Sequence, residues 1–321
     1  MKVEPKINPG ISVILAVYNG GDYLRLAVSS VLEQAYKDFE LLILDDCSTD
    51  GSWNYLASLN DERIVLFRNE TNKGLFYNLN FLIQKSNSRL IKLWSQDDIM
   101  YSHCLQTVVN FHQNYPGLGF SYSAVDKINE TGIIKENNWV DLTPEIVSTE
   151  LHALIAYYTG SIAGNIANVC INKNALEQVG FFNEAMKISG DFDMWVRVAK
   201  EHDTGFVNKK LIQLRDHENQ LSRNEKYYIN HVIEDAQVYK YLDGYVSRPV
   251  REKGKKILRR HKLMFYYTLM LKAFLKGNFS NGIQYLKILM TFDNIFVLTA
   301  SYIHTRINKP NPPKIFVNPL K

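Results

Sequence analysis

The sequence predicts an α/β protein with a Rossmann-like, doubly wound, mostly parallel sheet and an α-helical extension at its C-terminus. Three observations carry this prediction. Apolar, strand-length runs alternate with runs of helical spacing along residues 11–94. Two of these strands, 39–46 and 89–94, are each associated with a pair of aspartates at the carboxyl end. From residue 226 onward the pattern is helical.

The N-terminal part consists of repeated strand–helix units. Residues 11–18 form an apolar, β-branched run that Asn19-Gly20-Gly21 interrupts, and residues 23–34 then show helical spacing. Because strand 39–46 follows directly, this unit implies a parallel pair with a right-handed crossover. The same alternation continues with a helix over 52–60, a strand over 63–67, a helix over 76–85 and the strand 89–94.

The following segment is less regular. We expect a polar loop region over 129–160 and a helix over 194–202, which Asp191 and Asp193 precede. The remaining elements expected here are a helix from about 100 to 115, a strand over 119–128, a strand over 167–172, a helix over 174–179, and strands over 205–207 and 211–214.

Composition indicates a packed protein in a reducing compartment. The chain has 321 residues, of which 22% are charged, as expected of a globular fold rather than a disordered one. Cys47, Cys104 and Cys170 are widely spaced without a CxxC pair, so neither a disulfide framework nor a zinc site is expected. With no signal pattern and no apolar window long enough to span a bilayer, we expect a cytoplasmic protein.

Charge is distributed unevenly along the chain. Residues 248–321 hold 15 Lys and Arg against 2 Asp and Glu, a balance of +13, whereas the rest of the chain has a balance of −9. The basic residues of 248–262 are followed by an apolar run over 263–275. Residues 248–275 therefore predict a peripheral contact with an anionic membrane. The alternative is a helical region that packs on the body or on a second copy of the chain.

Two strand ends carry paired carboxylates: Asp45-Asp46 and Asp97-Asp98. Ligands of open α/β sheets bind beyond the carboxyl ends of the strands, and adjacent carboxylates repel each other unless a cation or solvent relieves the repulsion. A divalent cation that carries a diphosphate is the simplest explanation, with a solvated turn as the alternative for either pair alone. The chain has no GxGxxG after its first strand and no GxxxxGK[ST] motif, which excludes ordinary dinucleotide and P-loop enzymes.

Four motifs in this order resemble family 2 of the inverting glycosyltransferases, which have the GT-A fold. The resemblance covers about residues 10–223. It implies a catalytic domain over 1–223, with a nucleotide-sugar half over about 10–100 and an acceptor half over 101–223. Residues 224–321 would then form a basic helical region.

The resemblance implies a set of donor contacts. Ala16 and Tyr18 would contact the base, Asp46 would accept a hydrogen bond from the base or ribose, and Asn80 would lie in the helix after the Asn72-Lys73-Gly74 turn. The family often has Arg immediately before that last asparagine, and Leu79 stands there instead, so one basic donor contact is expected to be missing.

The resemblance also implies a metal site and a catalytic base. Ser95-Gln96-Asp97-Asp98 matches the family's Asp-x-Asp element with Ser95 in place of its first aspartate. Asp97 would then bind Mn²⁺ or Mg²⁺, Asp98 would lie beside it, and His217 would reach the metal or the diphosphate. Asp191 would be the catalytic base, although a carboxylate here could equally cap the helix that follows.

The function expected from this resemblance is transfer of a sugar from a nucleotide-diphosphate donor, UDP-sugar above all, to a glycan or lipid-linked acceptor in surface-polysaccharide synthesis. Tyr157-Tyr158 could belong to the acceptor surface or to the core. The alternatives are a non-catalytic sugar-binding module of the same fold and a sugar nucleotidyltransferase. A nucleic-acid partner is not expected, because the basic region carries no recognised motif.

Overall fold

The computed structural model describes residues 8–135, 141–218 and 225–308 and confirms the α/β class. Among these residues a ten-stranded sheet has the order β3-β2-β1-β4-β9-β6-β10-β5, with β7 paired to β6 and β8 paired to β10. The strands are β1 (Ile11–Val17), β2 (Phe39–Asp45), β3 (Ile64–Arg68), β4 (Leu90–Trp94), β5 (Ile99–Met100), β6 (Phe120–Ile128), β7 (Ile134–Lys135), β8 (Ile146–Val147), β9 (Cys170–Asn172) and β10 (Thr204–Arg215).

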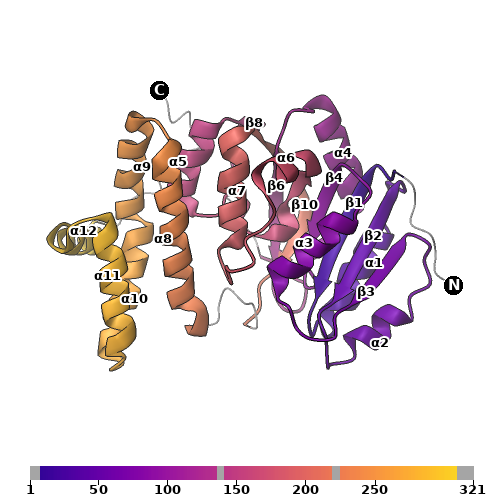
Figure 1. Cartoon of the computed structure of the whole chain (residues 1–321), viewed down its shortest axis with the longest axis horizontal. Helices are drawn as coiled ribbons and strands as arrows, with labels where there is room; N and C mark the ends of the chain where they lie inside the picture. The colour runs from indigo at the N-terminus through magenta and orange to yellow at the C-terminus, as the bar shows by residue number, and fades with distance from the viewer. Residues whose placement is uncertain (1–7, 136–140, 219–224, 309–321) are drawn as a thin grey trace.

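The helices divide between the two faces of the sheet and a stack beside it. Figure 1 shows the strands β1–β3 at one end of the molecule and helices α9–α12 at the other, with α5, α7 and α8 between them. The α-helices are α1 (Tyr23–Leu32), α2 (Ser52–Ala57), α3 (Leu75–Lys85), α4 (Cys104–Asn114), α5 (Thr149–Thr159), α6 (Lys173–Val179), α7 (Gly190–Glu201), α8 (Tyr228–Tyr245), α9 (Arg248–Arg260), α10 (Lys262–Leu275), α11 (Phe279–Phe292) and α12 (Ile295–Ile307).

The N-terminal half of the sheet is parallel and covered on both faces. Strand β1 pairs in parallel with β2 and β4, and β2 pairs in parallel with β3. Val13 and Leu15 of β1 belong to a buried cluster that includes residues of α1, α2 and α4, whereas Ile14 between them belongs to the cluster that includes residues of α3 and α7. Because successive side chains of a strand point to opposite faces, one apolar strand contributes to two cores, as a doubly wound sheet requires.

Strand β9 reverses direction within the sheet. It pairs antiparallel with both β4 and β6. The segment that leads into β9 therefore lies at the carboxyl end of β4, where Asp97 and Asp98 follow. This reversal brings residues 160–168 to the edge that carries the aspartate pairs.

The structure corrects the expectation of loops throughout 129–160. Residues 149–159 form helix α5, whose residues Leu151–Tyr157 are buried, and Ser148 caps it by accepting a hydrogen bond from the backbone N–H of Leu151. Tyr157 belongs to the core, since it is fully buried and stacks on Tyr239. Periodicity alone does not tell whether a short apolar run without polar alternation forms a buried helix or a strand. Residues 204–215 form a single strand, β10, with two register shifts against β6, where two strands were expected.

The helical region shares a hydrophobic core with the body. One buried cluster includes residues of α3, α5 and α7 together with Tyr239 of α8, Leu258 of α9 and Tyr266 of α10. The apolar run 263–275 is helix α10, and six of its side chains are buried. The boundary near residue 223 stays a prediction, but the helices beyond it are packed against the body.

No single helix among residues 8–135, 141–218 and 225–308 is long and apolar enough to cross a membrane. Helices α11 and α12 pass that test only as a pair, and they are bent by 97°.

Gly254 sets how closely α9 approaches α5. A Cβ atom at Gly254 would lie 2.1 Å from Cδ2 of Tyr157, whereas a Cβ atom at Gly244 in α8 would have no neighbour within 4 Å. We expect Gly254→Ala to lower the free energy of unfolding by about 1–3 kcal/mol, because the overpacked ring must shift. Gly244→Ala is the matched control, and its greater helix propensity should raise stability by up to about 1 kcal/mol. Equal effects of the two substitutions in denaturant unfolding would contradict this packing role.

Candidate active site

The candidate site lies beyond the carboxyl ends of β1, β2 and β4. Tyr18 follows β1 and is half exposed, Asp46 follows β2 and is buried, and Asp97 follows β4 with its side chain partly exposed. Ala16, near the end of β1, is half-buried. These predicted residues share one edge because parallel strands place their carboxyl ends on the same side of the sheet.

The loop after β1 is joined to the loop after β2. The backbone N–H groups of Asn19, Gly20 and Gly21 donate to Ser48 Oγ, Ser52 Oγ and Asp50 Oδ2, each at 2.9 Å. In return, Asn19 Oδ1 accepts the backbone N–H of Thr49 at 2.9 Å. Asn19 and Cys47 both have positive φ, at 49° and 64°. Such backbone angles are uncommon outside glycine, and here they occur at the ends of the two strands that face the site.

Asp46 fixes the turn that precedes α3. Its Oδ1 accepts the backbone N–H of Lys73 at 2.8 Å, and its Oδ2 accepts that of Gly74 at 2.9 Å. Asn69 Nδ2 also donates to Asp46 Oδ1, at 2.7 Å. Asp46 therefore connects β2 to the Asn72-Lys73-Gly74 turn. Its contact with the base or ribose stays a prediction.

Asn80 points away from this edge. Its Nδ2 donates to the carbonyl of Phe182 at 2.9 Å and to Glu184 Oε1 at 2.8 Å, and its Oδ1 accepts the backbone N–H of Phe182. Because both amide hydrogens are engaged, the geometry gives Asn80 a structural role that ties α3 to residues 182–184. The predicted donor contact of Asn80 stays a prediction.

Gln96 and Arg215 hold the turn that carries Asp97 and Asp98. The Gln96 side chain bridges the backbone of Tyr18, accepting its N–H at 2.9 Å and donating to its carbonyl at 3.1 Å. Arg215, at the end of β10, donates from Nε to the carbonyl of Asp97 at 2.9 Å. Its guanidinium also covers the ring of Tyr23, with Cζ 4.4 Å from the ring centroid. The turn is therefore fixed on one side by β1 and on the other by β10.

The two carboxylates of this turn have different environments. Asp98 is buried, and its Oδ1 accepts the backbone N–H of Arg215 at 2.8 Å. Burial raises the pKa of Asp98 to about 7, and the neighbouring charge of Asp97 adds to this rise while the Arg215 N–H opposes it. Burial also raises the pKa of Asp97, and His217 opposes that effect. Asp98 thus serves the link to β10, and Asp97 is the carboxylate presented to the site.

His217 and Asp97 form a pair that suits a divalent cation. His217 Nε2 lies 3.4 Å from Asp97 Oδ2, and both ring nitrogens are buried without a hydrogen bond among the described residues. A carboxylate oxygen and an imidazole nitrogen suit Mn²⁺ and related ions. Within the described parts of the chain, no group of three or more His, Cys, Asp and Glu residues could hold a metal alone. These two side chains therefore fit two of the ligand positions of such a metal.

Asp191 lies in the first turn of α7. Its Oδ2 accepts the hydroxyl of Ser161 at 3.0 Å, and its Oδ1 accepts the backbone N–H of Phe192 at 2.7 Å. Ser161 belongs to the segment that enters β9, so this bond places Asp191 at the same edge of the sheet as Asp97. Burial raises the pKa of Asp191 to about 6. Helix α7 begins at Gly190 with Ser189 as its N-cap residue, so Asp191 is not the cap.

Asp193 and Arg197 anchor α7 locally, which confirms the prediction made for them. Arg197 Nε donates to Asp193 Oδ2 at 2.9 Å. The same guanidinium donates to the carbonyls of Val179, Gly180 and Phe181. These residues hold the loop between α6 and α7 and take no part in the site.

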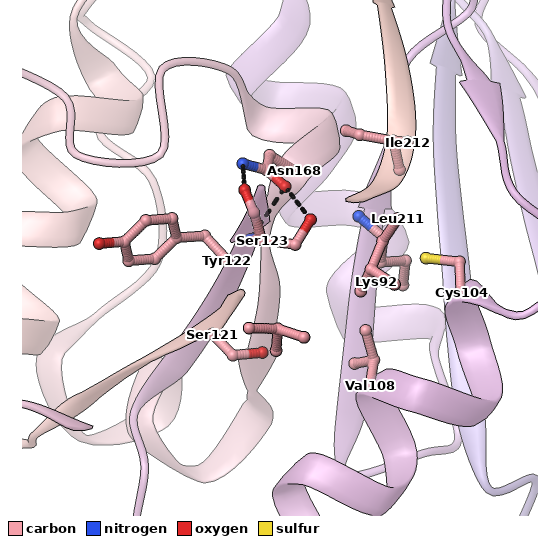
Figure 2. A pocket seen from close by; sticks show the side chains of 10 residues that line it. Lys92, Cys104, Val108, Ser121, Tyr122, Ser123, Asn168, Leu211 and Ile212 are labelled. Carbon is pink, nitrogen blue, oxygen red and sulfur yellow. Dashed lines mark hydrogen bonds between the residues drawn. The ribbon is translucent and has the colours of Figure 1, made fainter. Parts of the chain in front are cut away.

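A small cavity lined by residues of β4, β6, β10 and α4 contains a buried lysine. Figure 2 shows Lys92 pointing between Cys104 and the Ser123–Asn168 pair. The cavity has a volume of about 10 Å³, enough for one water molecule. Lys92 Nζ donates to the carbonyls of Leu93 and Ala167, and burial lowers its pKa. This cavity is too small for a substrate, so Lys92 is a structural residue.

Several residues at the site were not predicted from the sequence. Each of them contacts a residue that is distant in the sequence. Gln96 contacts Tyr18, Ser161 contacts Asp191 and Arg215 contacts Asp97, at separations of 78, 30 and 118 positions along the chain. The one available signal concerned Arg215, a charged residue that directly follows the strand expected over 211–214. Polar residues in loops, such as Gln96 and Ser161, carry no comparable signal.

Comparison with known sequences identifies the family. Residues 12–171 match the model of Glycosyl transferase family 2. An uncharacterized glycosyltransferase of Rickettsia felis is 28% identical over 221 residues, which are 67% of this chain and 35% of that relative. WfaP of Escherichia coli, a UDP-Glc:alpha-D-GlcNAc-diphosphoundecaprenol beta-1,3-glucosyltransferase, is 32% identical over 113 residues, 35% of this chain and 45% of WfaP. The chain thus aligns with about a third to a half of these relatives.

Solved structures share the fold. TarS of S. aureus, solved with UDP-GlcNAc, superposes with a TM-score of 0.68 at 15% identity, covering 88% of this chain and 80% of that one. The mannosyltransferase PcManGT of Pyrobaculum calidifontis, solved with GDP-Man and Mn²⁺, superposes with a TM-score of 0.58 at 12% identity, covering 96% of this chain and 90% of that one. At these identities the likeness concerns the fold, and it confirms the predicted GT-A architecture. The match to the family model and the sequence relatives show that this chain belongs to glycosyl transferase family 2.

Proposed function

We propose that this protein transfers a sugar from a nucleotide-diphosphate donor, most specifically a UDP-sugar, to an acceptor hydroxyl with inversion at the anomeric carbon. The observation that carries the proposal is the convergence of Asp97 and His217, 3.4 Å apart, on an edge that Asp191 also reaches. A diphosphate site and a separate carboxylate are the two parts that a single displacement at C1 requires.

The donor side of the site binds and orients the nucleotide. In this proposal Tyr18 and Asp46 contact the base and ribose, beside the joined loops after β1 and β2. Asp97 and His217 would hold Mn²⁺ or Mg²⁺, which when bound neutralises the charge that grows on the departing diphosphate. Gln96 and Arg215 keep Asp97 in place through the bonds described above.

The acceptor side supplies the base. As the acceptor oxygen forms its bond to C1, the bond from C1 to the diphosphate oxygen breaks, and the hydroxyl proton passes to Asp191. A partly buried carboxylate with a raised pKa suits this task, because it is ionised near neutral pH and still binds a proton well. The Ser161 hydroxyl and the Phe192 N–H orient the two oxygens of Asp191.

The relatives support the donor class and an acceptor class. The name of WfaP gives UDP-Glc as its donor and a sugar on diphosphoundecaprenol as its acceptor, and TarS was solved in complex with UDP-GlcNAc. By extension we propose a glycan or lipid-linked acceptor and a role in surface-polysaccharide synthesis. The presence of both Asp97 and Asp191 argues against a non-catalytic module, and a nucleotidyltransferase would need a glycine- and arginine-rich loop that Asn19-Gly20-Gly21 does not supply.

The first test concerns Asp97. Nucleotide release from UDP-, GDP- and dTDP-sugars should be fastest with a UDP-sugar and should depend on Mn²⁺ or Mg²⁺. Asp97→Ala should abolish turnover and the part of UDP binding that depends on Mn²⁺, as measured by calorimetry. Asp126→Ala is the control, because Asp126 pairs with Lys210 outside the site. Metal-dependent UDP binding that survives in Asp97→Ala would refute the assignment.

The second test concerns Asp191. Asp191→Asn keeps an oxygen for the Ser161 or Phe192 bond, so it should lower turnover about 10²-fold or more and leave UDP binding intact. In the native protein the base must be ionised. Since the pKa of Asp191 is raised to about 6, kcat/KM should fall as pH drops through that value and level off above about pH 7. If a loss of thermal stability in Asp191→Asn accounted for its loss of turnover, a purely structural role of Asp191 would be favoured.

We further propose a peripheral contact of the helical region with the cytoplasmic face of an anionic membrane, at a surface different from the one the sequence suggested. The apolar run 263–275 supplies little of this surface, because six of its side chains are buried and only Phe265 and Leu275 are exposed apolar side chains. Exposed apolar side chains lie instead at the end of α10 and on α11 and α12: Leu275, Phe279, Ile283, Met290, Phe296, Val297, Ile303 and Ile307. We call these residues the α11–α12 apolar surface.

The charge around the α11–α12 apolar surface complements an anionic membrane. Residues 248–308 hold 12 Lys and Arg against 2 Asp and Glu, a surplus of +10. Both acidic residues are already paired, Glu252 with Arg248 and Asp293 with Arg259. A basic, apolar surface of this kind suits the membrane interface, where each cation contributes about 1 kcal/mol.

Vesicle sedimentation tests this contact. The full chain should sediment with phosphatidylglycerol vesicles at low salt, release at high salt, and stay in solution with phosphatidylcholine. Phe296→Ser combined with Leu275→Ser should abolish sedimentation, because these side chains are 80% and 88% exposed. Leu26→Ser on α1, 51% exposed, is the matched control and should bind normally. Concentration-dependent self-association without vesicle binding would assign the surface to a second copy of the chain instead.

A further inference from the structure

Helix α8 of the helical region holds the segment that carries Asp191. Glu234, a buried residue of α8, accepts the backbone N–H of Lys187 on Oε1 at 2.9 Å. Its Oε2 accepts the N–H groups of Ile188 and Ser189 at 2.9 and 2.8 Å. One carboxylate thus satisfies three consecutive N–H groups that end at Ser189, the N-cap residue of α7.

Asp235, the next residue of α8, holds the same segment through the side chain of Ser189. Asp235 Oδ1 accepts the hydroxyl of Ser189 at 2.7 Å. Its Oδ2 accepts the hydroxyl of Tyr266, and Lys262 Nζ and His231 Nε2 lie 3.5 and 3.4 Å from it. Asp235 is 1% exposed, so this set of partners replaces the water that a buried charge would otherwise need.

The segment is confined from the other side as well. A Cβ atom at Gly190 would lie 2.6 Å from the ring of Phe76, so α3 presses on the backbone between Ser189 and Asp191. Phe76 in turn stacks on Phe182 at 5.6 Å. Residues 187–190 are therefore held between α8 and α3, and Asp191 is the next residue of the chain.

We propose that Glu234 and Asp235 are positioning residues for Asp191, because their hydrogen bonds to residues 187–189 fix the backbone that aims the base. The role given to Asp191 rests on the proposed function. The hold on residues 187–189 can be measured without it.

The charge of Asp235 changes the pKa of Asp191 in a definite direction. Burial is the main cause of the raised pKa of Asp191, the Ser161 and Phe192 hydrogen bonds oppose it, and the charge of Asp235 raises it further. The titratable groups that face Asp235 are His231, Lys262, Tyr266 and Tyr239. Removing the charge of Asp235 therefore lowers the pKa of Asp191, and the acid limb of the pH profile should move to lower pH.

A structural role alone predicts something different. If α8 served only to bury apolar surface, substitutions on it would lower stability and leave the pH profile and kcat of the remaining folded protein unchanged. Asp243 is the matched control: it also lies on α8 and pairs with Tyr157 and Lys255, without contact to residues 187–191.

The experiment compares Asp235→Asn, Glu234→Gln and Asp243→Asn in the full chain. Hydrogen exchange of a peptide over 185–192 should be faster in Glu234→Gln, because an amide nitrogen replaces one accepting oxygen, and unchanged in Asp243→Asn. The ¹³C-carboxyl titration of Asp191, identified by its loss in Asp191→Asn, should shift to lower pH in Asp235→Asn alone. With a UDP-sugar, Glu234→Gln should lower kcat by about tenfold to a hundredfold at unchanged donor KM.

The outcomes separate this proposal from the proposed function. The positioning role would be overturned, whatever the activity, if both test variants matched the native protein in two measurements. These are the hydrogen exchange over 185–192 and the titration of Asp191. Absence of turnover with every donor in the native protein would refute the proposed function, while the exchange and titration results would still decide the hold of α8. Should Asp235→Asn fail to fold, Glu234→Gln with native exchange would by itself overturn the proposal.

Discussion

Buried carboxylates that accept backbone N–H groups from distant segments hold this site together. Asp46 accepts N–H groups 27 and 28 residues away, and Asp98 accepts one 117 residues away. Glu234 accepts three that lie 45 to 47 residues earlier in the chain. A buried carboxylate without donors is costly, and an unpaired buried N–H is costly as well, so each pairing removes two penalties at once. Each loop of the site thus has a fixed position although none is part of regular structure.

The antiparallel strand β9 gives the site its second wall. A purely parallel sheet would return every connection to the opposite edge through a helix. Because β9 runs against β4 and β6, the segment before it reaches the carboxyl end of β4 and brings Ser161 to Asp191. The proposed donor residues come from parallel β-α units, and the proposed base, Asp191, comes from the part of the chain that follows this reversal.

The strands and most helices of the first hundred residues could be predicted, because periodicity and turn residues are local signals. Asp46, Asp97 and Asp191 could be singled out for the same reason, since each stands in a short motif. Asn80 shows the limit: the motif placed it correctly on α3, but only the structure reveals that its amide faces Phe182 and Glu184. Helix α5 was not predicted, because its apolar run lacks a polar face. Gln96, Arg215 and Glu234 could not be identified, because their partners are distant in sequence and no local pattern encodes a long-range hydrogen bond.

The hold of α8 on residues 187–189 has a consequence for biosynthesis. Translation delivers the chain from its N-terminus, so all ten described strands and α7 leave the ribosome before α8 does. Until then, three adjacent amides before α7 lack their acceptor, and Tyr239 and Leu242 of α8 have not yet covered the apolar faces of α5 and α7. The order of synthesis thus makes the catalytic centre one of the last regions of the nascent protein to mature.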